Sequence, residues 1–186
     1  SDVYKRQPYV ADVELEGMLY GALKFSDHPR AKVLSMDLSE AGAHPGVERI
    51  FTAEDIPGTR HTGLIVRDWP LMIEIGEETR YIGDVLAVVV ADTGKNAREA
   101  VPKINVDYEV LTPVTDPKAA LESSSPQVHA KGNLLSNAEI HRGDIEAARQ
   151  KSAHITKGTY STQRIEHAFM EMECCLAAPS EDGVEV

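Results

Sequence analysis

The residues with the best spacing for metal chemistry lie near the carboxyl end of the chain. His167 and Glu171 have an H-x-x-x-E spacing, with Glu166 and Glu173 beside them. On a helix, residues four apart share a face and could hold a metal ion. In a strand they would lie about 13 Å apart, and the sequence that follows is typical of a strand. Because no third ligand and no H-E-x-x-H motif accompany them, we favour a structural segment over a metal site.

The two cysteines, Cys174 and Cys175, are adjacent. Neighbouring residues rarely form an unstrained disulfide, so we expect free thiols in a reducing compartment. The pair could act in redox chemistry or hold a metal. Beside Met172, Leu176 and Ala177, however, the pattern favours small apolar residues of a core.

Three histidines and the only tryptophan lie in predicted turns and loops. His28, His44 and His61 stand close to proline or glycine, where we expect solvated or locally bonded side chains. Trp69 lies in a long segment without periodicity. It is either a hydrophobic clamp that pins this loop to the domain or an anchor at a subunit or domain interface, where exposed aromatic residues are enriched.

Common catalytic and phosphate-binding motifs are absent from the sequence. There is no G-x-G-x-x-G, no Walker A loop and no G-x-S-x-G elbow. The glycines Gly17 and Gly21 fall within a predicted strand that opens no helix. A hydrolase is not supported, because no nucleophile and base can be paired. We therefore assign no catalytic, cofactor-binding or metal-ligating residue within this chain.

The best-formed element is a strand, turn, helix and strand over residues 80–110. Val85–Ala91 is an unbroken apolar run rich in β-branched residues, which predicts a strand covered on both faces. Thr93 offers a capping oxygen to a short helix, and Pro102 marks its end. Val106–Val110 alternates as a half-buried strand does. We expect this unit to form the core of a domain.

The other predicted elements are short. Before the central unit we expect an extended segment (residues 8–16), three strands (17–26, 31–37 and 47–51), two helical turns (38–43 and 52–56) and a long loop (59–79). After it we expect a short helix over 118–122, a second helix over 145–151 with Ile145 and Ala148 facing inward, and extended segments over 154–160 and from 163 onward.

The composition and net charge exclude several classes of protein. The 186 residues are 42% hydrophobic and 26% charged, as in ordinary globular proteins. The net charge of −11 argues against nucleic acid or anionic membrane as partners. Apolar runs reach only about seven residues, against the roughly 20 needed to cross a bilayer, and the polar N-terminus lacks a signal peptide. These features favour the cytoplasm.

The chain is long enough for one domain and part of another. We divide it into an unassigned N-terminal segment (residues 1–8), a first domain (9–122), a linker rich in serine and polar residues (123–139) and the start of a second domain (140–186). It begins without methionine, and residues 182–186 read as a turn and the opening of a strand with no partner after it. We therefore expect a fragment of a longer polypeptide.

Several short motifs follow one another over residues 9–122. They are Tyr9–Val13, Gly17–Ala22 with Ser26–Val33, Pro45–Val47 with Thr52–Gly58, Tyr81–Ala91 with Val106–Glu109, and Pro113–Asp116 with Ala120 and Leu121. Their order and spacing resemble the start of the large molybdenum-binding subunit of the xanthine dehydrogenase and aldehyde oxidase family. The resemblance implies an α+β fold, namely the α/β-hammerhead domain, with a mixed sheet and short packed helices.

The later part resembles the opening of that family's molybdopterin-binding domain, through Gly143-Asp144, Gly158–Tyr160 and Glu166–Glu171. The resemblance implies an intact enzyme that hydroxylates purines, other N-heterocycles or aldehydes with oxygen from water. It also implies molybdopterin, 2Fe-2S centres and FAD, partly on partner domains or subunits. The family's cofactor contacts and catalytic glutamate have no matching position here, so we expect this fragment to bind no cofactor.

Two departures from the family pattern stand out. Asp84-Val85-Leu86 replaces the usual [EQ]-P-[VI], and Arg30 stands where the family often has histidine. The phrase Thr79–Asp84 is more similar to the branch of selenium-dependent xanthine dehydrogenases. The alternative to an enzyme fragment is a self-sufficient, non-catalytic binding or scaffold domain.

Overall fold

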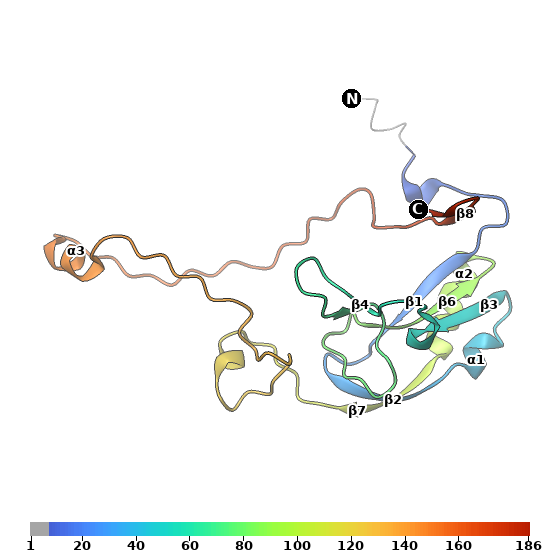
Figure 1. The fold of residues 1–186 in the computed structure, drawn as a ribbon, viewed down its shortest axis with the longest axis horizontal. Coiled ribbons are helices and arrows are strands. Elements are labelled where there is room, and N and C mark those ends of the chain that lie inside the picture. Colours follow the sequence, from blue (N-terminus) through green and yellow to red (C-terminus); the bar gives the residue numbers. More distant parts are fainter. Residues whose placement is uncertain (1–7) are drawn as a thin grey trace. The chain divides into compact units, whose positions relative to one another are not determined.

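A computed structural model describes residues 8–186 of the chain (Figure 1). Of the N-terminal segment predicted over residues 1–8, all but Pro8 lies outside the described residues. Residue contacts divide the chain into two units. Gly17–Asn137 forms one unit, and Ala138–Val186 forms the other together with the segment that ends at Glu16.

The centre of the first unit is a three-stranded antiparallel sheet. Strand β6 (Val85–Ala91) lies between β1 (Tyr20–Phe25) and β3 (Val47–Thr52). Its side chains are buried on both faces: Leu86, on one face, and Ala87 and Val89, on the other, have no exposed surface. The predicted strand covered on both faces is therefore confirmed.

The helix after β6 also begins where the sequence predicts. In α2 (Gly94–Ala100), the side chain of Thr93 accepts a hydrogen bond from the backbone N–H of Asn96 at 3.2 Å. The chain then tightens into the 3₁₀ helix η3 (Val101–Lys103), which contains Pro102. Figure 1 shows α2 beside β1 and β6, against which it packs.

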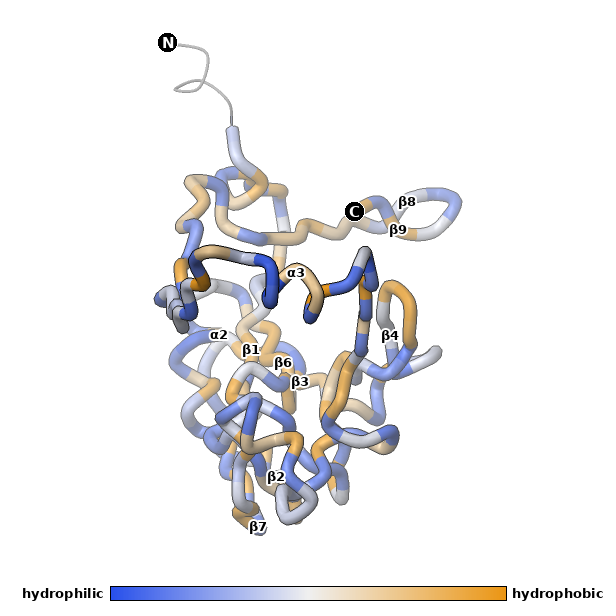
Figure 2. The backbone as a smooth tube through the Cα atoms, turned by 90° about the vertical axis from the view of Figure 1, so that its left-hand side faces the viewer, coloured by the Kyte–Doolittle hydropathy of each residue, from blue (hydrophilic) through white to orange (hydrophobic). Residues whose placement is uncertain are grey.

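A second, two-stranded sheet pairs β2 (Ala31–Asp37) with β7 (Asn105–Val110), again antiparallel. The shorter elements of this unit are α1 (Ser39–Gly42), η2 (Ala53–Asp55), β4 (His61–Thr62), β5 (Trp69–Pro70) and η4 (Ala119–Leu121). Strands β4 and β5 form a small hairpin inside the segment predicted as a long loop. The loop after β4 is hydrophobic, as its orange colour in Figure 2 shows.

Two hydrophobic clusters meet at β6. One holds Ala87, Val89 and residues of α1, α2 and the chain after η3. The other contains Val33, Ile73 and Leu86. Because successive residues of a strand point to opposite faces, β6 contributes to both clusters. Small sheets with short packed helices confirm the predicted α+β class.

The second unit buries little surface. It contains η1 (Val10–Asp12), α3 (Ile145–Lys151) and a hairpin of β8 (Ala178–Ser180) and β9 (Gly183–Glu185). From Ala138 to Val186 no side chain is buried. Among the described residues, none of the helices is both long and apolar enough to cross a membrane.

Two predictions for this unit are wrong. Helix α3 begins at Ile145 with Asp144 accepting the N–H of Ala147 at 2.9 Å, as expected, but it has no buried residue. Ile145 is 65% exposed and Ala148 is exposed as well, rather than inward. Residues 10–12 form a 3₁₀ helix instead of remaining extended. The strand predicted near the end of the chain is β9, and it pairs with β8, which precedes it.

Candidate functional site

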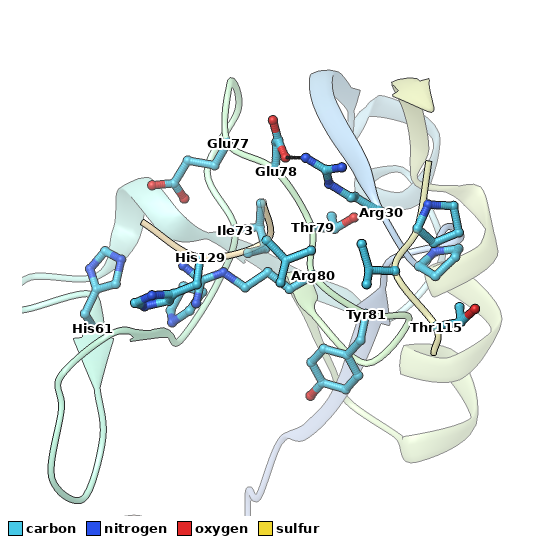
Figure 3. A pocket seen from close by; sticks show the side chains of 15 residues that line it. Arg30, His61, Ile73, Glu77, Glu78, Thr79, Arg80, Tyr81, Thr115 and His129 are labelled. Atoms are coloured by element: carbon cyan, nitrogen blue, oxygen red, sulfur yellow. Dashed lines mark hydrogen bonds and ion pairs between the residues drawn. The ribbon is translucent and has the colours of Figure 1, made fainter. Parts of the chain in front are cut away.

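The main candidate site is a pocket of about 610 Å³ within the first unit, of the size that small-molecule sites usually have. Figure 3 shows Arg30, His61, Glu77, Glu78, Arg80 and His129 around it. We call it the Arg80 pocket. It is lined by Pro29, Arg30, His61, Pro70, Ile73, Glu77, Glu78, Thr79, Arg80, Tyr81, Pro113, Val114, Thr115, Val128 and His129.

A buried carboxylate fixes the turn that carries Arg80 and Tyr81. Asp84 is 4% exposed, and its Oδ2 accepts hydrogen bonds from the backbone N–H groups of both residues. The turn is held further by the ring of Tyr81, which packs edge-on against Trp69 with centroids 5.6 Å apart. The Arg80 guanidinium donates to the backbone oxygen of Asp68 at 2.9 Å.

Each glutamate of the pocket is paired with an arginine. Glu77 accepts two hydrogen bonds from Arg60, at 2.9 and 3.1 Å, and one from the backbone N–H of Glu74. The bonds with Arg60 hold the pKa of Glu77 below its ordinary value and raise the pKa of Arg60. Glu78 pairs with Arg30 at 3.1 Å. A carboxylate with a lowered pKa is a weak base, so Glu77 is poorly suited to general base catalysis at neutral pH.

One wall of the pocket comes from residues 113–133, which we call the strap. Asn133 ties it together, because its side-chain amide donates to the backbone oxygens of Ala120 and Pro126 and accepts from the N–H of Val128. Nε2 of His129 lies 2.9 Å from Oδ2 of Asp68. Since Nδ1 of His129 accepts the N–H of Lys131, Nε2 carries the proton and donates to Asp68.

The pocket therefore has apolar walls, and its charged side chains Arg30, Glu77, Glu78, Arg80 and His129 already have hydrogen-bond partners within the same unit. The hydroxyl of Thr79, for example, bonds to the backbone of Ala31. Among the lining residues, no nucleophile lies against a base. This arrangement can hold an apolar group or stabilise the fold, but it does not assemble a catalytic centre.

The histidines predicted in turns lie in different surroundings. His28 packs edge-on against Tyr108, and His61 lines the Arg80 pocket. His44 is not solvated: its side chain is 13% exposed, and Nδ1 lies 3.2 Å from Nζ of Lys103. Its buried Nε2 has no hydrogen-bond partner and lies 3.8 Å from a carboxylate oxygen of Glu99.

Trp69 combines features of both interpretations. Its contact with Tyr81 pins the hairpin of β4 and β5, as a clamp would. It is also 52% exposed, so part of the ring remains open to solvent.

The structure does not bring the C-terminal candidates together. His167 stacks on Phe169 in an exposed segment outside any helix or strand, so it does not share a helix face with Glu171. Over residues 8–186, no three side chains of histidine, cysteine, aspartate or glutamate gather as metal ligands. Cys174 and Cys175 are exposed thiols, which corrects the prediction that they lie in a core.

The same segment does not enclose a site by itself. The side chains of residues 138–186 are exposed or half-buried throughout, whereas a cofactor of the size of molybdopterin needs an enclosed site. We assign no catalytic step to the residues of this segment.

Comparisons with known proteins show to which family this fold belongs. Residues 5–112 match the family model described as the "aldehyde oxidase and xanthine dehydrogenase, a/b hammerhead domain". The chain belongs to this family. Residues 127–186 match a second model, the "molybdopterin cofactor-binding domain". The predicted hammerhead domain is thereby confirmed.

Individual members agree with the assignment. The chain is 34% identical to a probable xanthine dehydrogenase subunit of Bacillus subtilis, over 94% of this chain and 23% of the relative. It is 33% identical to the nicotinate dehydrogenase large molybdopterin subunit of Eubacterium barkeri, over 95% of this chain and 41% of the relative. The chain therefore spans less than half the length of these relatives.

A solved structure has a similar fold. Quinoline 2-oxidoreductase from Pseudomonas putida matches with a TM-score of 0.71 and 31% identity, over 84% of this chain and 21% of that chain. The family is thus one of oxidoreductases, and members that bind a molybdenum cofactor are among the relatives.

The Arg80 pocket was not predicted from the sequence. Its lining comes from segments up to 100 residues apart, from Pro29 to His129, and no local pattern connects them. The available signal was weak: Asn133 and His129 are polar residues with good local hydrogen-bonding capacity in a segment that otherwise reads as a linker.

Proposed function

We propose that this chain is the structural N-terminal portion of a molybdenum hydroxylase. The observation that carries the proposal is the hammerhead match over residues 5–112. The chemistry of the Arg80 pocket supports a structural role, because its charged groups pair with oppositely charged or polar side chains of the same unit. The hammerhead unit would serve as a packed platform for the cofactor domain and partner subunits.

In the intact enzyme, the proposed reaction is hydroxylation of a purine, another N-heterocycle or an aldehyde with oxygen from water. Relatives named as acting on xanthine, nicotinate, quinoline and aldehydes support this range. Molybdopterin would bind in the intact protein. Electrons would pass through 2Fe-2S centres towards FAD on partner domains or subunits, in an oligomer located in the cytoplasm. Nucleic acid and membranes are not proposed partners.

We propose a hammerhead domain at residues 9–122, a linker at 123–139 and the start of the molybdopterin-binding domain at 140–186, with residues 123–133 of the linker forming the part of the strap that is bonded to the first unit. Coverage of only 23% and 41% of two relatives supports the view that the chain is part of a longer subunit. Membership of the selenium-dependent branch stays a prediction that rests on Thr79–Asp84.

The test compares the 186-residue chain with the complete polypeptide that its gene encodes. We expect the complete polypeptide, isolated with its partners, to contain about one molybdenum per chain and to oxidise xanthine, nicotinate or an aldehyde. The 186-residue chain should contain no molybdenum when both are measured by mass spectrometry of the metal. A stoichiometric molybdenum signal in the short chain would overturn the structural role.

The alternative is a self-sufficient binding or scaffold domain. One observation favours it: the whole lining of the Arg80 pocket lies within Gly17–Asn137. A gene that encodes little beyond this chain, and a product without molybdenum, would support the alternative.

A further inference from the structure

The Arg80 pocket is lined by segments that come from different parts of the first unit. The strap contributes Pro113, Val114, Thr115, Val128 and His129. The rest of the lining comes from the chain before β2, from β4 and β5, and from residues 73–81. A small molecule in this pocket would therefore contact the strap and the sheet-bearing part of the unit at once.

The charges around the pocket balance one another. Glu78 pairs with Arg30, and Glu77 pairs with Arg60. Both Arg80 and His129 donate to Asp68, Arg80 to its backbone oxygen and His129 to its carboxylate. Three arginines and three carboxylates thus meet here. A charged ligand would leave water without a counter-ion of its own in the pocket, which is costly. An uncharged ligand is the better fit.

Arg80 keeps hydrogen-bond donors that the fold does not use. A guanidinium carries five N–H groups, and within residues 8–186 the one hydrogen bond from this side chain is that of Nη1 to the backbone oxygen of Asp68, at 2.9 Å. Figure 3 shows the side chain extending toward His129, which donates to the carboxylate of the same aspartate. The remaining N–H groups can donate to an acceptor on a ligand, such as a carbonyl oxygen.

The other walls are apolar and stiff. Proline side chains and β-branched side chains have few accessible rotamers, and the lining contains Pro29, Pro70, Ile73, Pro113, Val114 and Val128. The ring of Tyr81 is fixed against Trp69. A volume of about 610 Å³ with such walls suits a flat, rigid ring system, and a guanidinium can also stack on an aromatic face.

We propose that the Arg80 pocket binds a small uncharged aromatic molecule that bears a carbonyl group. The carbonyl oxygen accepts a hydrogen bond from the Arg80 guanidinium, and the ring contacts the apolar walls. Because the strap supplies part of those walls, the bound molecule holds the strap against the rest of the unit. This ligand site goes beyond the proposed platform role, and it requires no molybdenum because its whole lining lies within Gly17–Asn137.

The test is a titration of the ¹⁵N-labelled 186-residue chain with 2-naphthamide, followed by two-dimensional NMR. We expect saturable shifts at one site, gathered at the backbone amides of Arg80, Tyr81, Val114 and Val128. The anion 2-naphthoate has the same shape, and it should bind about tenfold more weakly or worse because the pocket offers it no unpaired cation. Calorimetry on the complete polypeptide with its partners should give the same affinity for 2-naphthamide as the short chain.

A pair of variants isolates Arg80. Arg80→Gln should weaken 2-naphthamide binding by about tenfold or more, since a hydrogen bond from a charged donor is lost. Arg98→Gln removes the same charge from the exposed side of α2, outside the pocket, and should leave the affinity unchanged. The ring compound 2-methylnaphthalene, which has no carbonyl, should bind wild type and Arg80→Gln alike. This comparison separates loss of the hydrogen bond from loss of the fold.

Ligand binding should also slow the opening of the strap. If 2-naphthamide binds only while the strap is in place, a concentration ten times its Kd lowers the open population about tenfold. Trypsin cleavage after Lys131, read by mass spectrometry, should slow by the same factor. An unchanged cleavage rate would overturn the part of the proposal that concerns the strap.

Four results would overturn the binding site itself. They are absence of saturable shifts, equal affinity for 2-naphthoate and 2-naphthamide, an Arg80→Gln variant that binds like wild type, and loss of the site in the complete polypeptide because another segment of the subunit fills it. None of them bears on the proposed platform role, which the molybdenum measurement tests separately.

Discussion

Asp84 acts on the backbone rather than on a ligand. Its buried carboxylate accepts the N–H groups of Arg80 and Tyr81 and so shapes the turn that faces the Arg80 pocket. The carboxylate thereby gives two backbone N–H groups of the turn a hydrogen-bond partner. Asp84 opens the segment Asp84-Val85-Leu86, which stands where the family usually has [EQ]-P-[VI]. This departure has a local physical role, because the Asp84 side chain bonds to the turn that precedes it.

Glu77 makes the stability of the fold depend on pH. Its ordinary pKa of 4.5 is lowered in the folded chain, first by the hydrogen bonds from Arg60. The stabilisation is therefore complete above about pH 5 and is lost as the pH falls through the lowered pKa. We expect Glu77→Gln to lower the free energy of unfolding by about 1 kcal/mol at pH 7, since the side chain is 36% exposed and solvent screens the pair.

The measurement is urea unfolding of both proteins at pH 7 and near pH 3. The difference between wild type and Glu77→Gln should shrink at the lower pH. Asp37 and Asp55 also have lowered pKa values, caused mainly by hydrogen bonds from Ser39 and Thr52, so the wild type itself loses stability in acid. A difference that stays constant with pH would contradict the prediction, and Glu109→Gln, in the exposed face of β7, is the control.

At the scale of the elements, local pattern predicted the central unit well. The apolar run of β6, the threonine cap of α2 and the proline in η3 each act through their immediate neighbours. The start of α3 also followed from its cap, Asp144. In each case the interaction that fixes the element joins residues only a few positions apart, so it can be recognised in the sequence.

Features that depend on distant partners were missed. The strands β4 and β5 are each two residues long, which is too short for an alternation of apolar and polar residues to be recognised. The burial of Ile145 was mispredicted because helical spacing indicates an apolar face but not what covers it. The Arg80 pocket needs pairs such as Asp68 with His129, which are 61 residues apart.

The strap gives a prediction at this scale. We expect His129→Ala to release its end, because the hydrogen bond to Asp68 is lost, and to destabilise the strap by about 1 kcal/mol. Trypsin should then cleave after Lys131 about fivefold faster, since cleavage follows the population of the open form. His141→Ala, whose ring is 84% exposed, should leave the rate unchanged. Equal rates for wild type and His129→Ala would show that the bond does not hold the strap.

The interactions that stabilise the chain are distributed unevenly between its two units. The first unit contains both hydrophobic clusters, whereas residues 138–186 contain no buried side chain. Burial of apolar surface is the main favourable term in folding. The cooperative unfolding of this chain should therefore report on the first unit alone, and the net charge of −11 is spread over both parts.

Truncation tests this view and places the domain boundary. A chain of residues 9–137 should unfold in urea at the same midpoint and with the same slope as the full chain, because the slope follows the surface exposed on unfolding. A chain of residues 9–122 ends at the boundary predicted from the sequence but lacks Asn133 and His129. It should be less stable by about 2 kcal/mol, since it loses several hydrogen bonds of the strap.

The two truncations have distinct outcomes. Equal stability of 9–122 and 9–137 would mean that residues 123–137 behave as a linker in solution. A lower stability of 9–122 alone would instead place the end of the folded hammerhead unit after the strap. If removal of residues 138–186 lowers the midpoint as much as removal of residues 123–137, the exposed segment contributes contacts to folding, and the uneven distribution of stability argued from burial is wrong.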